Sequence, residues 1–135
     1  MTGPTEQERI ANLRQVPLFS QLTDEALTQV LACASDFDAA PGHVLVQMNQ
    51  AGTGLFVIEE GSATVELPGR KVELGPGDFF GELALLRDDE KHTARVSAAS
   101  AIKGVAIRRD DFENLLDKEP TMAIAMLKAL AKRVS

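Results

Sequence analysis

The spacing of hydrophobic residues changes twice along the chain. Near the N-terminus apolar residues recur every three or four positions, as they do on one face of a helix. This pattern predicts two N-terminal helices within residues 5–34. The first carries Ile10 and Leu13 on one face, and the second begins after Thr23, whose hydroxyl is suited to capping a helix N-terminus.

From residue 36 to residue 108 the period becomes two, which is typical of half-buried strands. Ala63, Val65 and Leu67 give the clearest alternation with polar residues. Turns rich in glycine and proline, such as Pro68-Gly69 and residues 75–78, separate the short apolar runs. Many short strands with turns of this kind predict a sandwich or jelly-roll barrel rather than a parallel sheet.

Helical spacing returns in residues 110–135, where we expect two C-terminal helices. Asp110 or Asp111 is predicted to cap the first, and Pro120 suits the first turn of the second. The apolar arc of the second helix is wider than packing on one body usually requires. This arc comprises Met122, Ala123, Met126, Leu127, Ala129, Leu130 and Val134. It predicts self-association or continuation in a longer parent protein; the alternative is that the arc packs wholly on the barrel.

Composition sets the broad class of the protein. The 135 residues are 44% hydrophobic and 25% charged, as expected for one soluble globular domain over residues 1–135. The N-terminus is polar and no window approaches the roughly 20 apolar residues of a membrane span, so we expect a cytoplasmic protein without membrane contact. The net charge of −6 argues against direct nucleic-acid binding. Cys33 is the single cysteine, and we expect it to pack in the core rather than to act as a reactive thiol.

The chemistry is concentrated in one stretch of the sequence. It reads Phe-Phe-Gly-Glu-Leu-Ala-Leu-Leu over residues 79–86 and, after an acidic insert, continues as His-Thr-Ala-Arg from residue 92. Gly81 permits a backbone conformation closed to other residues and lets a ligand approach the main chain. The free N–H groups at the start of a following helical turn would form an anion site. The carboxylate of Glu82 can accept hydrogen bonds from sugar hydroxyls.

This stretch resembles the phosphate-binding cassette of cyclic nucleotide-binding domains, found in catabolite activator-type regulators and in protein kinase regulatory subunits. Residues 80–85 match the family pattern at every position, and Thr93-Ala94 match its second half. The resemblance implies a mainly-β fold in which an eight-stranded jelly-roll barrel (a double-stranded β-helix), residues 36–108, is flanked by N- and C-terminal helices. The expected ligand is cAMP or cGMP, and no metal is expected.

The resemblance also implies a role for each cassette residue. Backbone donors around Gly81, Leu83 and Ala84 would face the cyclic phosphate. Glu82 would bind the ribose 2′-hydroxyl, and Thr93 would add a hydroxyl to the phosphate.

The family's phosphate-binding arginine is replaced by His92. A guanidinium binds two phosphate oxygens and is always charged, whereas histidine offers at most one suitable donor and is mostly neutral at pH 7. The loss of such a pair costs on the order of 2–4 kcal/mol. Lys91 is the better candidate to compensate, because strand alternation puts Arg95 on the opposite face from His92.

Three functions follow from these observations. The first is a regulatory domain that binds a cyclic nucleotide, weakly because of His92, and signals through its C-terminal helices to an effector or a second copy. The second is a degenerate domain of the same fold that works only through protein contacts. The third is a metal-dependent enzyme of the cupin type, which needs several histidines, whereas this chain has only His43 and His92. We therefore expect no enzymatic activity. The choice between cAMP and cGMP stays open, as does whether the chain is part of a longer protein.

Overall fold

The computed structural model describes residues 5–46, 54–81 and 94–134. The helices are α1 (Glu6–Arg14), the short 3-10 helix η1 (Pro17–Phe19), α2 (Asp24–Cys33), α4 (Arg109–Lys118) and α5 (Pro120–Val134). The strands are β1 (Ala34–Ala39), β2 (Val44–Val46), β3 (Gly54–Glu60), β4 (Ala63–Leu67), β5 (Arg70–Leu74), β6 (Phe79–Phe80), β7 (Arg95–Ala98) and β8 (Ile102–Arg108).

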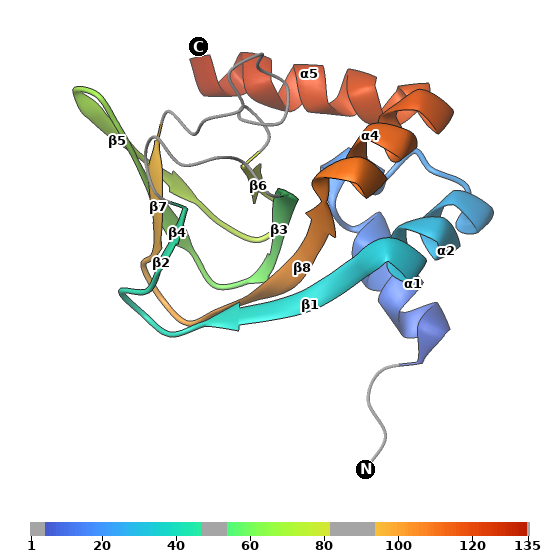
Figure 1. Ribbon diagram of the computed structural model, residues 1–135, viewed down its shortest axis with the longest axis horizontal. Helices are drawn as coiled ribbons and strands as arrows, with labels where there is room; N and C mark the ends of the chain where they lie inside the picture. The colour runs from blue at the N-terminus through green and yellow to red at the C-terminus, as the bar shows by residue number, and fades with distance from the viewer. Residues whose placement is uncertain (1–4, 47–53, 82–93, 135) are drawn as a thin grey trace.

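The strands form two antiparallel sheets, with the order β1-β8-β3-β6 in the first and β2-β7-β4-β5 in the second (Figure 1). The helices gather on the side of the first sheet that faces away from the second. The predicted mainly-β fold with flanking helices is confirmed. Within the described ranges the two sheets are separate, so a closed eight-stranded barrel stays a prediction.

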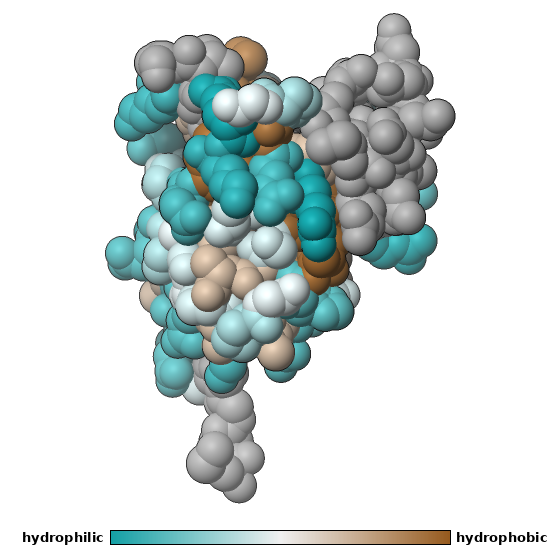
Figure 2. Space-filling view, turned by 90° about the vertical axis from the view of Figure 1, so that its left-hand side faces the viewer, coloured by the Kyte–Doolittle hydropathy of each residue, from teal (hydrophilic) through white to brown (hydrophobic). Residues whose placement is uncertain are grey.

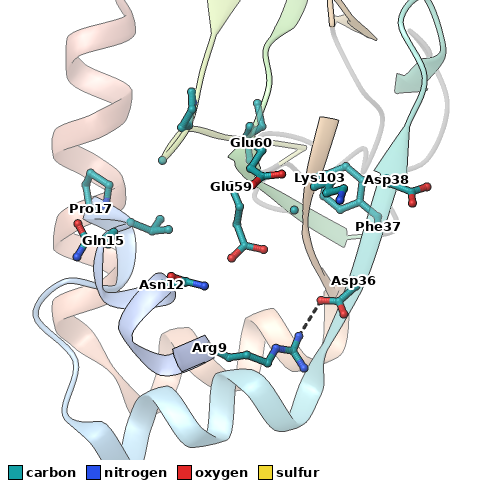
Figure 3. Close-up of a pocket in the computed structure, with 15 residues that line it drawn as sticks. Arg9, Asn12, Gln15, Pro17, Asp36, Phe37, Asp38, Glu59, Glu60 and Lys103 are labelled. Carbon is teal, nitrogen blue, oxygen red and sulfur yellow. Dashed lines mark hydrogen bonds and ion pairs between the residues drawn. The ribbon is translucent and has the colours of Figure 1, made fainter. Parts of the chain in front are cut away.

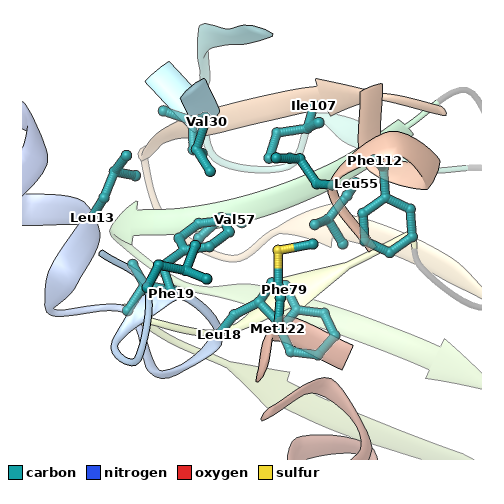
Figure 4. Packing of buried hydrophobic residues seen from close by; sticks show 14 of the residues in the cluster. Leu13, Leu18, Phe19, Val30, Leu55, Val57, Phe79, Ile107, Phe112 and Met122 are labelled. Atoms are coloured by element: carbon teal, nitrogen blue, oxygen red, sulfur yellow. The ribbon is translucent and has the colours of Figure 1, made fainter. Parts of the chain in front are cut away.

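The first sheet is buried on both faces because its strands alternate between two cores. We call the face toward the helices the helix-side face and the face toward the second sheet the interior face. Val57 lies in the helix-side core, while the next residue, Ile58, lies in the interior core. Both side chains are fully buried. Figure 4 shows the helix-side core, in which the sheet contributes Leu55, Val57, Phe79 and Ile107, and the helical segments contribute Leu13, Leu18, Phe19, Val30, Phe112 and Met122.

Of the two helix caps predicted from the sequence, one is found in the structure. The Thr23 hydroxyl accepts a hydrogen bond from the Ala26 N–H at 3.1 Å, so the predicted cap of α2 is confirmed. The predicted aspartate cap of α4 is wrong: Arg108 occupies the N-cap position and makes no side-chain capping bond. Asp110 and Asp111 lie in the first turn instead, where their negative charges interact favourably with the positive end of the helix dipole.

The last helix, α5, begins at Pro120 as expected and divides its apolar residues between two environments. Met122 and Met126 are buried in the helix-side core, and Leu130 packs against that core. Ile124 and Leu127 point outward with 53% and 67% of their surface exposed. The predicted apolar arc is therefore split, and its outward residue Leu127 does not pack on the body of the domain. No helix in the described ranges is long and apolar enough to span a bilayer.

The close approach of β8 to its neighbours depends on Gly104. It pairs with Phe37 of β1 and Ile58 of β3. A Cβ atom at this position would overlap the Val57 carbonyl oxygen and would lie 2.8 Å from Cε1 of Phe37. Because both neighbours belong to the packed centre of the sheet, neither can move away cheaply.

We therefore predict that Gly104→Ala destabilises the fold by about 1–3 kcal/mol, the usual cost of overpacking a core. Gly75→Ala is the matched control, since a Cβ there would meet nothing within 4 Å. Urea denaturation followed by circular dichroism measures both variants. Equal midpoints for the two would show that the sheet relaxes around the added methyl group.

Candidate functional site

The described part of the predicted cassette is the strand β6 and the glycine that follows it. Gly81 has a φ of +93°, in the region that favours glycine. A Cβ atom on Gly81 would lie 2.7 Å from the carbonyl oxygen of Gly54, at the start of β3. Both observations support the glycine turn that the sequence predicts at the entry to the cassette.

The turn before β6 is fixed to the centre of the first sheet by backbone hydrogen bonds. The Ile58 N–H donates to the Asp78 carbonyl at 2.9 Å, and the Gly77 N–H donates to the Ile58 carbonyl at 2.8 Å. The Asp78 carboxylate closes the turn by accepting from the Gly75 N–H at 2.8 Å. Gly81 therefore follows β6, which pairs with β3. The hydrogen-bonded turn of residues 75–78 directly precedes β6.

Aromatic packing anchors β6 on its interior face. Phe80 stacks on Phe56 with ring centroids 5.0 Å apart and planes within 10°, and Phe56 meets Phe37 edge to face at 5.4 Å. Phe79 points the other way, into the helix-side core. This row of three rings could not be predicted from the sequence, because the strands that carry them are far apart in the chain. The strand β3 pairs directly with β6, and β8 lies between β1 and β3.

The remaining cassette residues, Glu82, Leu83, Ala84, His92 and Thr93, lie outside the described residues, and so does Lys91. Their proposed roles stay predictions. The two described ends of the cassette belong to different sheets, because β6 is in the first and β7 in the second.

Arg95, the other candidate to replace the missing arginine, faces away from the interior. It pairs in register with Glu66 of β4, and its Nη1 lies 4.0 Å from a Glu66 carboxylate oxygen. Its neighbour Val96 is buried in the interior core. The outward direction agrees with the alternation expected from the sequence. Figure 2 shows this side of the molecule, where the outer face of the second sheet is largely hydrophilic and hydrophobic residues appear as a narrow band.

The interior between the sheets keeps some apolar surface only half-buried. Phe56 of the first sheet and Val65 and Val72 of the second pack against the interior core without being fully covered. Val65 and Val72 pair directly across β4 and β5. Such half-covered apolar side chains are suited to contact with a flat apolar part of a ligand.

Two other candidates from the sequence have no support as reactive groups. Cys33 packs against the helix-side core, and its Sγ donates to the Val30 carbonyl at 3.4 Å. Burial raises the pKa of its thiol, and the nearby carboxylate of Asp111 adds to the effect, so the reactive thiolate is disfavoured. His43 is exposed, and in the described ranges no three His, Cys, Asp or Glu side chains come together as a metal site would require.

Comparison with known proteins gives a consistent result. The family model of the cyclic nucleotide-binding domain matches residues 37–119. The chain is 35% identical over 118 residues to a cyclic nucleotide-gated potassium channel of Rhizobium etli, which covers 87% of this chain and 33% of the channel. It is 30% identical over 107 residues to the cAMP-dependent protein kinase regulatory subunit of Yarrowia lipolytica, which covers 77% of this chain and 28% of that subunit.

Among solved structures, the regulatory subunit of a cAMP-independent protein kinase A from Trypanosoma brucei superposes with a TM-score of 0.79 at 26% identity. The match covers 93% of this chain and 47% of that one. The chain thus spans about a third of the length of the channel and of the yeast kinase subunit, and about half of the trypanosome structure.

Proposed function

The chain belongs to the cyclic nucleotide-binding domain family, and from this premise we propose that it is a regulatory module that binds cAMP or cGMP between its two sheets. The observation that carries the proposal is the turn at Gly81. Gly81 is the second residue of the family motif, and its positive φ and close contact with Gly54 leave room only for glycine. This turn supports the proposal, because glycine at the entry to the cassette would let a phosphate approach the backbone N–H groups that follow.

In this proposal the ligand lies with its phosphate at the cassette and its base toward the interior. Backbone N–H groups from Gly81 to Ala84 and the Thr93 hydroxyl would bind the phosphate, and Glu82 would bind the ribose. The half-buried Val65 and Val72 would cover one face of the base. Since His92 stands in for the arginine, we expect affinity about 30- to 1000-fold below that of a domain with the full phosphate clamp.

The signal would pass through Phe79 to α5. Phe79 adjoins Phe80 and Gly81 in the sequence, but its side chain lies in the same core as Met122 of α5 (Figure 4). A ligand that orders the cassette would shift β6, and the packed core would transmit that shift to the helix. An effector or a second copy would then contact α5 within residues 120–135.

A second candidate is a degenerate domain that binds no nucleotide and acts through protein contacts alone. Two observations favour it: the replacement of the arginine by His92, and the similarity to a kinase regulatory subunit described as cAMP-independent. Under either candidate we expect no enzymatic activity, no bound metal and no direct contact with nucleic acid or membrane. The expected location is the cytoplasm.

The first test restores the missing charge. His92→Arg should tighten binding of cAMP or cGMP by about tenfold or more, because a permanent bidentate cation recovers much of the lost pairing energy. Isothermal titration calorimetry of the 135-residue protein measures the change. His43→Arg is the control, since it adds the same charge at an exposed position before β2. If His92→Arg folds and still binds neither nucleotide, the degenerate candidate replaces the first.

The second test removes the proposed ribose contact. Glu82→Ala should lower cyclic nucleotide affinity by roughly 10- to 100-fold, the effect of deleting a hydrogen bond to a charged group, and should leave the melting temperature without ligand unchanged. Glu90→Ala removes the same charge from the acidic insert and should not weaken binding. A large drop in melting temperature for Glu82→Ala alone would identify Glu82 as a structural residue.

The third test concerns the outward face of α5, which we propose mediates self-association. Leu127 is 67% exposed, so Leu127→Glu should not disturb the core, and it should raise the dimer dissociation constant about tenfold or more. Thr121→Glu, also exposed on α5, is the matched control. Analytical ultracentrifugation distinguishes the outcomes. A protein that is monomeric at millimolar concentration before any substitution would contradict this role.

A further inference from the structure

A groove of about 1180 Å³ lies between α1 and the helix-side face of the first sheet (Figure 3). Its lining mixes apolar residues with charged and amide side chains, unlike the core beside it. The helix α1 and its C-cap contribute Arg9, Asn12 and Gln15, and the sheet contributes Asp36 from β1, Glu59 from β3 and Lys103 from β8.

Glu59 points into this groove (Figure 3), on the same face of β3 as Leu55 and Val57, as the alternation of the strand requires. In the pairing of β3 with β8, Ile58 lies opposite Gly104 and Glu60 lies opposite Lys103, which leaves Glu59 without a register partner in β8. An extra residue of this kind is a β-bulge, and bulges often lie beside functional sites. The bulge therefore lies at the groove, and alternation directs the Glu59 carboxylate into it.

Within the described ranges, no hydrogen bond or ion pair joins the Glu59 carboxylate to another side chain. The cation that α1 contributes to the groove, Arg9, is bound to Asp36 by a hydrogen-bonded ion pair of 2.7 Å. Burial raises the pKa of Glu59, the carboxylates of Asp36 and Glu60 raise it further, and the Arg9 guanidinium only partly opposes them. The ionised side chain is thus partly desolvated and close to other negative charges, an arrangement that a cation entering the groove would relieve.

We propose that the groove binds a basic segment of a partner protein, with the Glu59 carboxylate accepting hydrogen bonds from an arginine or lysine side chain of that segment. The volume of the groove lies above the range of about 300–1000 Å³ for small-molecule pockets and is large for a single amine. Asn12 and Gln15 carry exposed amide groups, which can donate to and accept from the peptide groups of a bound chain. Together these features favour a peptide over a free amine.

This site is separate from the proposed nucleotide site. The groove reaches Phe37 and Ile58 of the interior core, but its lining includes neither Gly81 nor the pair Val65 and Val72. The groove proposal therefore does not rest on cyclic nucleotide binding, and either one can fail while the other stands.

The test is a titration of the 15N-labelled protein, followed by nuclear magnetic resonance, with the pentapeptide acetyl-GRARG-amide. A matched peptide carries citrulline in place of each arginine and so keeps the shape without the charge. The arginine peptide should give saturable shifts at the amides of residues 9–15, 58–60 and 103–104. The citrulline peptide should bind about tenfold more weakly or worse, because it lacks the charge-assisted hydrogen bonds.

Two variants separate this site from the general attraction of an acidic protein for a basic peptide. Glu59→Gln should weaken binding of the arginine peptide about tenfold. Glu73→Gln removes one negative charge from β5 in the other sheet and should change binding by less than about twofold, since surface charges contribute little to a distant site. Equal loss in both variants, or equal binding of the two peptides, overturns the proposal. So does agmatine binding as tightly as the arginine peptide, which would indicate a site for a free amine.

The stability of Glu59→Gln gives an independent readout. Because folding raises the pKa of Glu59, its stabilising contribution is complete below the pKa of the unfolded chain and is lost as pH rises through the folded pKa. At pH 7 the ionised carboxylate lowers stability, so Glu59→Gln should melt at the same or a higher temperature. A lower melting temperature at pH 7 would show that the carboxylate is needed for folding rather than for binding, and would also overturn the proposal.

Discussion

The pairing of β3 with β8 is the constraint on which the rest of the structure depends. These two central strands are buried on both faces, so each residue along them faces either the helices or the second sheet. The pair can approach β1 closely because Gly104 has no side chain where the Phe37 ring lies. One sheet thereby separates two environments: an apolar core under the helices, and an interior in which several apolar side chains are only half-buried.

The two proposed sites follow from this separation. Gly81 is held next to the start of β3 by the strand β6, and its motif continues toward the second sheet. Glu59 lies near the end of β3 on the helix-side face, opposite to the face that carries Phe56 and Ile58. Phe79 and Phe80, adjacent in sequence, fix β6 to the two cores in opposite directions. A shift of this short strand would change the packing in both cores. This gives a physical basis for coupling ligand binding to α5.

Local features of this fold could be predicted from the sequence because they depend on neighbouring residues. The cap at Thr23, the hairpin turn at Pro68-Gly69 and the glycine conformation at Gly81 are of this kind. Features that depend on distant segments could not. Alternation predicts that β3 has a buried face, but not that both faces are buried or that β8 lies beside it. The spacing on α5 predicts an apolar arc, but only the packing against η1 and α4 determines that Leu127 points outward.

The difference between features that depend on neighbouring residues and features that depend on distant segments also explains how much of each site could be predicted from the sequence. The cassette is contiguous, so its residues could be predicted as a unit, although Gly81 alone of the expected ligand contacts lies in the described part of the chain. The groove is assembled from α1, η1, three strands and the turn before β6, and its residues form no motif. Alternation places Glu59 on the same face as Leu55 and Val57, but only the fold shows that α1 and β1 form a groove at this end of the strand. Charge patterns along the chain cannot identify such a residue, because the charges that surround it come from other strands.

The central claim is that the turn at Gly81 is the entry to a working cyclic nucleotide site. The most direct measurement is a titration of the 15N-labelled protein with cAMP, and separately with cGMP, that follows the backbone amide of Gly81 by nuclear magnetic resonance. The account predicts a saturable shift of that amide together with those of Val65 and Val72, and smaller changes in the groove around Glu59. If neither nucleotide shifts the Gly81 amide at millimolar concentration, the site does not bind cyclic nucleotides and the claim is wrong.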